Sequence, residues 1–154
     1  MMRIYLGLGT NLGDKELNLR VAVQKIEERI GKVISLSAFY ATAPWGFQSD
    51  NNFLNAAAGV ETSLSPFDIL ERTQRIEQEI GRLHKSHDGV YSDRLIDIDL
   101  LLYGDKILQD ERLSLPHPLM AERKFVLEPL AEIAPDVVHP VLHKTIRELF
   151  LVLS

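Results

Sequence analysis

The sequence predicts an α+β fold, and three observations support this prediction. Four apolar runs have the length of strands, two longer segments repeat apolar residues at helical spacing, and turn-forming residues separate them. In chain order these segments read strand, helix, strand, strand, helix, strand. This order favours a ferredoxin-like βαββαβ arrangement, with an antiparallel sheet and both helices on one face. Because such a fold hosts many unrelated functions, it leaves the chemistry open.

Each element follows from a local pattern. Strands are expected at 3–8, 33–40 and 53–62, with a fourth inside DRLIDIDLLLYG, residues 93–104. The first helix is expected at 14–30, where apolar residues recur at helical spacing and Gly31 ends it. The second runs from Ser65-Pro66, an N-cap followed by proline at the first helical position, to Gly81. A short hairpin strand near 106–108 and helical segments at 119–133 and 145–153 complete one domain, 1–154.

Composition and charge narrow the functional classes. With 154 residues, 45% hydrophobic and 25% charged, the chain can bury the core of a globular domain. A net charge of -5 argues against nucleic-acid binding, and the lack of cysteine excludes disulfides and thiolate metal sites. No apolar run has the length of a membrane span, and the N-terminus runs straight into a strand pattern rather than a signal peptide. We therefore expect a cytoplasmic monomer that binds neither membrane nor nucleic acid.

Two aspartates inside the fourth strand are the most unusual feature of the sequence. Asp97 and Asp99 are two residues apart, so both carboxylates project from the same face, while Ile96, Ile98 and Leu100 face the helices. At roughly 6 Å and an effective dielectric of about 20, their mutual repulsion is about 3 kcal/mol. A salt bridge to Arg94 is a structural explanation for one strand aspartate, but two aspartates on one face need more positive charge.

A hard divalent cation satisfies this need, because carboxylate oxygens are the ligands of Mg²⁺. Mg²⁺ takes one or two carboxylates and fills its remaining positions with water and substrate phosphates. Arginines that could bind such phosphates flank the strand: Arg82 and Arg94 before it, and Arg112 and Arg123 after it. His117 lies between two prolines in LPHPLM, a locally rigid segment, and is as consistent with a structural role as with a functional one.

Other motifs are less specific. Phe53 and Asn55 share a strand face, and with Phe125 they could sandwich a flat heterocycle and read its edge, although the pattern alone favours both rings as core residues. In GLGTNLG the third glycine of a dinucleotide fingerprint would fall on Leu12, so that interpretation fails. Gly7 and Gly9 more simply allow a close approach to the strand.

Taken together, these motifs resemble those of the 6-hydroxymethyl-7,8-dihydropterin pyrophosphokinase family of the folate pathway. The resemblance covers almost the whole chain, through GLGTNLGD, FYATAPWG, FLNAA, TQRIEQEIGR, DRLIDIDLLLYG and LPHPLMAERKFVLEPLAEIAP. It implies a ferredoxin-like α/β sandwich that transfers diphosphate from ATP to the pterin hydroxymethyl group and releases AMP. ATP is then the co-substrate and Mg²⁺ the cofactor.

The resemblance also implies roles for individual residues. It makes Asp97 and Asp99 the ligands of two Mg²⁺ ions, and Arg82 and Arg94 the arginines of a mobile catalytic loop. ATP-binding positions fall on Gln74, Glu77, Arg112, Ser114, His117 and Arg123. Pterin-binding positions fall on Thr42, Phe53, Asn55 and Phe125, with the two phenylalanines as stacking planes. From residue chemistry alone, Gln74 and Glu77 are ordinary helix-surface residues.

The sequence departs from the family pattern in one region. Many family members carry an arginine where His84 stands, and a Trp-Gly-Pro-Arg run before the aspartate strand. Here the run is HDGVYSDR, without tryptophan, which leaves open whether Tyr91 or His87 replaces the missing ring.

Two other functions compete with the enzyme. A non-catalytic ferredoxin-like module that senses a nucleotide or metal would bind ligand without chemistry, but it gives no reason for the two loop arginines. An RNA-binding sheet would need exposed aromatics on its face and a basic charge balance. The net negative charge and the two strand carboxylates argue against the RNA-binding sheet.

Overall fold

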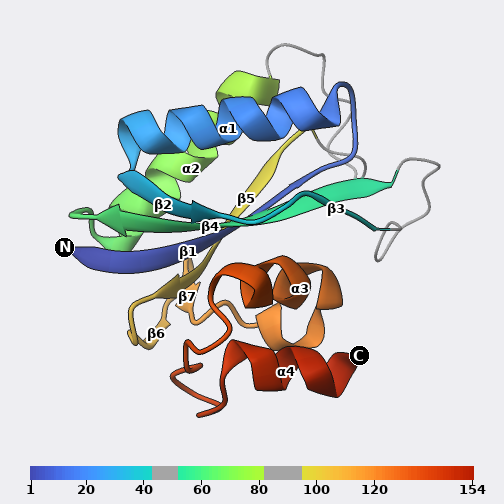
Figure 1. Ribbon diagram of the computed structural model, residues 1–154. Coiled ribbons are helices and arrows are strands. Elements are labelled where there is room, and N and C mark those ends of the chain that lie inside the picture. The colour runs from blue at the N-terminus through green and yellow to red at the C-terminus, as the bar shows by residue number, and fades with distance from the viewer. Residues whose placement is uncertain (43–51, 82–94) are drawn as a thin grey trace.

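The computed structural model describes residues 1–42, 52–81 and 95–154. Figure 1 shows a central sheet with helices on both faces. The strands are β1 (Met2–Thr10), β2 (Lys32–Leu36), β3 (Tyr40–Thr42), β4 (Phe53–Thr62), β5 (Asp97–Tyr103), β6 (Leu108–Gln109) and β7 (Ser114–Leu115). The helices are α1 (Lys15–Arg29), α2 (Pro66–Gly81), α3 (Lys124–Ile133) and α4 (Ile146–Leu153), with a short 3-10 helix, η1 (Met120–Glu122).

The main sheet has the strand order β2-β4-β1-β5, and β3 extends the pairing of β4 beyond β2. All neighbouring strands are antiparallel. This order and the βαββαβ succession confirm the ferredoxin-like fold predicted from the sequence. The central strand β1 pairs with β4 on one side and β5 on the other, so the β1 residues from Ile4 to Gly9 each lie between a residue of β4 and one of β5.

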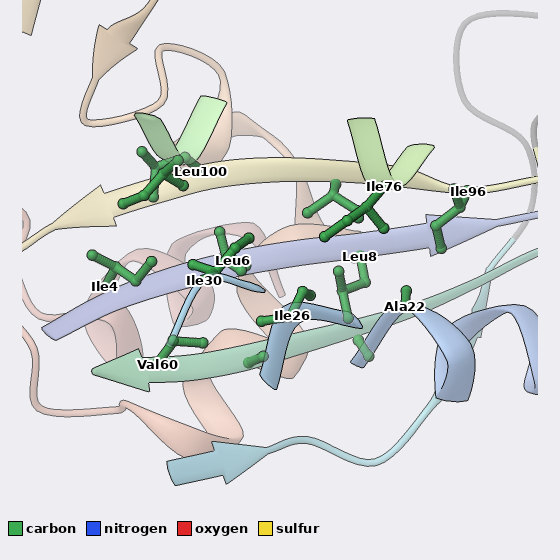
Figure 2. Close-up of a cluster of buried hydrophobic side chains, with 14 of the residues drawn as sticks. Ile4, Leu6, Leu8, Ala22, Ile26, Ile30, Val60, Ile76, Ile96 and Leu100 are labelled. Carbon is green, nitrogen blue, oxygen red and sulfur yellow. The ribbon is translucent and has the colours of Figure 1, made fainter. Parts of the chain in front are cut away.

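Helices α1 and α2 cover one face of the sheet, as predicted. Their apolar residues meet the alternate residues of β1, β4 and β5 in one cluster, much of which is labelled in Figure 2: Ile4, Leu6, Leu8, Ala22, Ile26, Ile30, Val60, Ile76, Ile96 and Leu100. Burying a leucine or isoleucine side chain of this kind stabilises the fold by about 2 kcal/mol. The N-terminus of α1 is capped by Asp14, whose side chain accepts the Leu17 N–H at 3.1 Å.

Helices α3 and α4 lie on the opposite face (Figure 1), where a second apolar cluster forms. A register shift in the β1–β5 pairing leaves Leu101 between Leu100, which pairs with Leu6, and Leu102, which pairs with Tyr5. Because of this extra residue, Leu101 and Leu102 both belong to the second cluster. The bulge thus ends the strict alternation, which holds in β5 up to Leu101 and fails at Leu102.

Three boundaries differ from the sequence prediction. The strand expected at 33–40 is divided into β2 and β3, because Ser37 between them turns its side chain inward to accept the Ala57 N–H at 2.9 Å. The helix expected at 119–133 is divided into η1 and α3, with extended backbone at Arg123 between them. The C-terminal hairpin pairs only two residues on each side. Among the described residues, no helix is long and apolar enough to cross a membrane.

Candidate active site

A pocket opens on the sheet face that carries α3, next to the N-terminal end of that helix. Strands β1, β4 and β5 form its floor, and β3 and α3 contribute walls. It is lined by Gly7, Leu8, Gly9, Thr42, Phe53, Asn55, Ala56, Asp97, Asp99, Leu101, Arg123, Phe125 and Val126. The pocket therefore brings together seven of the residues predicted for the site, from β3, β4, β5 and the N-terminal end of α3.

The two aspartates lie on one face of β5, as the two-residue spacing predicts. Both are half-buried and line the pocket, while Ile98 between them is buried in the core under α2. Across β1, Asp97 is in register with Gly9 and Asp99 with Gly7. The carboxylates therefore stand beside two residues without side chains, and this leaves room above the strand for a ligand.

Glu77 of α2 reaches the outer edge of β5, where its Oε2 accepts the Ile98 N–H at 2.7 Å. Burial raises the pKa of the Glu77 carboxyl to about 8, the Ile98 hydrogen bond opposes that rise, and the negative charges of Asp97 and Asp99 add to it. Glu77 is thus not an ordinary helix-surface residue, because it meets the aspartate strand directly. Asp97 and Asp99 concentrate negative charge at one end of the pocket, and the raised pKa keeps Glu77 behind them largely protonated at neutral pH.

His117 is joined to the same edge of β5. Its backbone N–H donates to the Leu101 carbonyl at 2.9 Å, and its Nδ1 accepts the Leu119 N–H at 3.2 Å. Because Nδ1 is an acceptor, the neutral ring carries its proton on Nε2 and can donate it. Burial lowers the pKa of His117, the Arg123 guanidinium lowers it further, and Asp97 opposes this. A cis peptide bond joins Leu115 to Pro116 just before this residue.

The opposite end of the pocket is aromatic and amide in character. Phe53 comes from β4 and Phe125 from the first turn of α3. Asn55 is only 5% exposed, and its Nδ2 donates to the Thr42 hydroxyl at 2.8 Å. The Arg123 guanidinium lies 5.7 Å from the centre of the Phe125 ring, which is a cation–π distance. Both phenylalanines are half-buried at the pocket rather than fully enclosed in the core.

Glu132 connects the two walls of this end. Its carboxylate accepts the Tyr40 hydroxyl at 2.6 Å and the Ala38 N–H at 3.1 Å. The hydrogen bond to Glu132 raises the pKa of Tyr40 to about 12. Since Glu132 belongs to α3 and Tyr40 to β3, this contact fixes the helix that carries Phe125 against the strand that carries Thr42.

Other predicted residues lie away from the pocket walls. Gln74 is exposed on α2, and Ser114 is half-buried in β7. Arg112 is exposed, with its guanidinium 5.2 Å from the centre of the Phe67 ring. Arg82 and Arg94, like the candidate ring replacements at 87 and 91, lie outside the described residues.

Several pocket residues were not predicted as site residues. Gly7 and Gly9 form part of its floor, and Leu101 and Val126 contribute apolar surface. The glycines had a signal in the sequence, because two glycines two positions apart in a strand leave one face bare. Leu101 follows from the same two-residue alternation as Asp97 and Asp99, whereas the bulge that turns Leu102 to this face has no signal in the sequence.

Comparisons with known proteins decide the family. The model of the 7,8-dihydro-6-hydroxymethylpterin-pyrophosphokinase family matches residues 5–135. The chain is 49% identical over 142 residues to the 2-amino-4-hydroxy-6-hydroxymethyldihydropteridine pyrophosphokinase of Porphyromonas gingivalis, covering 91% of this chain and 95% of that protein. The chain belongs to the 7,8-dihydro-6-hydroxymethylpterin-pyrophosphokinase family.

Other relatives of this pyrophosphokinase family are longer. A folic acid synthesis protein of Dictyostelium discoideum is 39% identical over 148 residues, which are 96% of this chain but 22% of that protein. The wild-type HPPK-DHPS of Plasmodium falciparum, solved as a crystal structure, is similar with a TM-score of 0.78 at 20% identity, covering 99% of this chain and 44% of that one. That likeness supports the fold alone, and the chain spans less than half the length of the Plasmodium protein. The family, the enzyme class and the link to folate synthesis predicted from the sequence are confirmed.

Proposed function

We propose that the chain transfers the diphosphate group of ATP to the hydroxymethyl group of 6-hydroxymethyl-7,8-dihydropterin and releases AMP. The observation that carries this proposal is the composition of the pocket. One end presents two carboxylates, and the other presents two aromatic rings and a buried amide. A polyphosphate–metal complex suits the first end, and a flat heterocycle with hydrogen-bonding edges suits the second.

In this mechanism the pterin lies between Phe53 and Phe125, with Asn55 at its edge. Its hydroxymethyl oxygen is then directed along the floor of β1 toward Asp97 and Asp99. The register of the sheet supports this path, because Gly9 separates Asn55 from Asp97 across β1. The rings and the amide would hold the alcohol in place before reaction. Such orientation speeds a reaction between two substrates, because the entropy of bringing them together is lost on binding rather than in the transition state.

The site also suits magnesium. Asp97 and Asp99 are hard oxygen donors that line the pocket from one strand face. Within the described ranges, no group of three or more histidine, aspartate or glutamate side chains is placed to hold a metal alone. We therefore propose that the two aspartates hold two Mg²⁺ ions together with ATP phosphates. When bound, the ions would neutralise phosphate charge and make the alcohol more acidic.

The remaining site residues are assigned to ATP. His117 would donate its Nε2 proton to a phosphate oxygen, and Arg123 would bind a second one. We propose the same nucleotide for Gln74, Glu77, Arg112 and Ser114, and the role of charge neutralisation during transfer for Arg82 and Arg94. Glu77 would in addition hold β5 through Ile98.

The transfer itself exchanges one P–O bond for another. The pterin alcohol oxygen forms a bond to the β-phosphorus of ATP, and the bond from this phosphorus to the α–β bridging oxygen breaks. AMP leaves with that oxygen, and the proton of the alcohol is released to water. Positive charge and ordered donors around the phosphates lower the barrier, because negative charge is spread over oxygens in the transition state.

A three-component assay tests this proposal. The purified chain is mixed with ATP, Mg²⁺ and 6-hydroxymethyl-7,8-dihydropterin, and the nucleotide product is identified by chromatography. AMP should form only when all three are present, together with a stoichiometric amount of pterin diphosphate. Release of ADP in place of AMP, or tight ligand binding without any product, would reject the proposal, and the second outcome would support a binding module.

The single domain 1–154, the monomeric state and the cytoplasmic location stay predictions. Light scattering of the purified chain checks the oligomeric state. One cooperative unfolding transition is expected if the chain is a single domain, whereas two separate transitions would contradict it.

A further inference from the structure

Gly9 lies at the centre of the pocket floor. On β1 it is in register with Asn55 of β4 on one side and with Asp97 of β5 on the other. Its backbone does not adopt the left-handed conformation that favours glycine; among the described glycines only Gly13 and Gly104 do. Backbone conformation therefore does not require glycine at position 9, and the reason for it must lie in the space that a side chain would fill.

That space is occupied by the amide of Asn55. A Cβ atom built on Gly9 would lie 3.1 Å from Asn55 Oδ1 and 3.7 Å from Phe53 Cδ1. The first distance is shorter than an ordinary carbon–oxygen contact, so the amide would have to move. The other end of the same amide is fixed, because Nδ2 donates to the Thr42 hydroxyl at 2.8 Å. Asn55 is thus held by the hydrogen bond at Nδ2, and the absence of a side chain on Gly9 leaves Oδ1 the space it occupies.

This arrangement gives the amide a defined polarity. One Nδ2 hydrogen is used by Thr42, so Oδ1 remains as the acceptor and the second Nδ2 hydrogen as a donor. Because Asn55 is 5% exposed and lines the pocket, a ligand that cannot match this pattern leaves a buried polar group unpaired. A heterocycle with an N–H donor on its edge can satisfy Oδ1.

We propose that Gly9 is a specificity-determining residue, which keeps the Asn55 carbonyl in place to read an N–H donor on the edge of the bound heterocycle. The inference rests on the proposed function for the identity of that heterocycle. Gly9 acts through Asn55, so it is a positioning residue rather than a catalytic one. Gly7 provides a contrast on the same strand face, because the three atoms nearest to a Cβ there all belong to the flexible side chain of Leu101, the first at 3.3 Å.

A double-mutant cycle tests the inference. The variants Gly9→Ala, Asn55→Ala and the double variant are compared with the unchanged chain, using 6-hydroxymethylpterin as the probe and calorimetry to measure Kd. Gly9→Ala should weaken binding about tenfold, the loss expected when a buried hydrogen bond is misplaced. In the Asn55→Ala background the same substitution should have no further effect, because the methyl group no longer meets an amide. Independent, additive losses in Kd would overturn the proposal, as would unchanged binding in Gly9→Ala.

The matched contrast is Gly7→Ala, alone and with Asn55→Ala. Any loss of affinity that it causes should be the same in both backgrounds, because its contact is to Leu101 and not to Asn55. The KM for ATP should stay constant in Gly9→Ala, whereas a general distortion of the site would raise it. If Gly9→Ala fails to fold but the double variant folds, the result supports the proposal, because removing the Asn55 amide relieves the steric conflict. If both fail to fold, the conflict lies elsewhere and the proposal is wrong.

The outcomes also separate this inference from the proposed function. An unchanged chain that binds the pterin and yields no AMP would reject the function and leave the role of Gly9 intact. An unchanged chain that yields AMP, with Gly9→Ala binding the pterin equally well, would reject the role of Gly9 alone.

Discussion

The two faces of the sheet are built from the same strands but have opposite chemistry. Toward α1 and α2, strands β1 and β5 present Leu6, Leu8 and Ile98, all in the buried cluster. Toward the pocket, the neighbouring residues of the same strands include Gly9 and Asp97. The two-residue alternation of a strand therefore lets one segment stabilise the fold on one face and bind ligands on the other.

The difference has a physical consequence. Aspartate and glycine contribute little to a hydrophobic core, and aspartate is unfavourable in strands. Hence the pocket face must be stabilised by the core behind it and by groups at the edge of β5. Glu77 and His117 provide such contacts, through the Ile98 N–H and the Leu101 carbonyl. Beyond the bulge at Leu101 the same face becomes apolar again and packs under α3.

The largest difference between an effect on activity and an effect on stability is expected for Asp97→Ala, on the pocket face. The rate of AMP formation should fall about a hundredfold or more, as when a principal electrostatic group is removed from an active site. The free energy of unfolding in urea should fall far less than in a core variant, because the relieved repulsion from Asp99 offsets the lost hydrogen bond to Glu77. AMP formation at the unchanged rate would remove the proposed metal role. A large loss of stability would show that the carboxylate supports the fold, contrary to the comparison.

The reverse result is expected for Leu6→Ala, on the opposite face of β1. Leu6 is fully buried, so the free energy of unfolding should fall by about 3 kcal/mol, from lost burial and the cavity left behind. KM values for ATP and pterin should stay constant for the folded fraction. Leu6→Met is the matched control and should cost less than about 1.5 kcal/mol. If Leu6→Ala instead raised the pterin KM as strongly as a pocket variant, the two faces would not be separable.

The two faces also differ in how much of each could be predicted from the sequence. The order of elements and the shared face of Asp97 and Asp99 follow from local periodicity, which depends only on backbone geometry. The pairing of Phe53 with Phe125 across the pocket, by contrast, depends on how α3 docks on the sheet. No local pattern encodes that docking, so the residues alone offered Phe125 only as a candidate second plane, and the family resemblance assigned it to the site.

Glu77 shows the same limit. On its helix it looks like a surface residue, and its contact with Ile98 requires knowing that β5 is an edge strand beside α2. Boundaries failed for a related reason: Ser37 interrupts an otherwise strand-like run because its hydroxyl meets the Ala57 N–H of the neighbouring strand. Tertiary contacts of this kind override local propensity.

An intermediate effect is expected at His139, in the segment between the two helices that cover the second face. Its Nδ1 accepts the N–H groups of Val141 and Leu142, at 3.2 and 3.0 Å, and its side chain is buried. His139→Ala leaves both donors without this acceptor and should lower the free energy of unfolding by about 2 kcal/mol at pH 7.5. His139→Asn is the control, since the asparagine oxygen can take the place of Nδ1.

The pH dependence of this effect has a definite sign. Burial lowers the pKa of His139 below its usual 6.5, and His143 nearby lowers it further. The folded state therefore favours neutral imidazole, whose contribution is complete above pH 6.5 and is lost as pH falls through the lowered pKa. Urea unfolding at several pH values should show the advantage of the unchanged chain over His139→Ala shrinking on acidification. An advantage that grew instead would contradict the assigned hydrogen bonds.

The smallest effect is expected on the outer surface of α1 and α2, far from either face of the sheet. Glu79 accepts hydrogen bonds from Arg29 Nη2 at 2.8 Å and Lys25 Nζ at 3.2 Å, and these cations, Arg29 first, lower the pKa of Glu79 to about 2. The contribution to stability is therefore present above the usual pKa of 4.5 and disappears as pH falls toward 2. Because surface pairs are screened, Glu79→Gln should lower Tm only slightly at pH 7, and the difference should vanish in strong acid or high salt. AMP formation should not change. A change in the AMP rate without a change in Tm would mean that the surface charges of α1 and α2 influence the pocket electrostatically. The division of the sheet into a stabilising face and a reactive face would then be wrong.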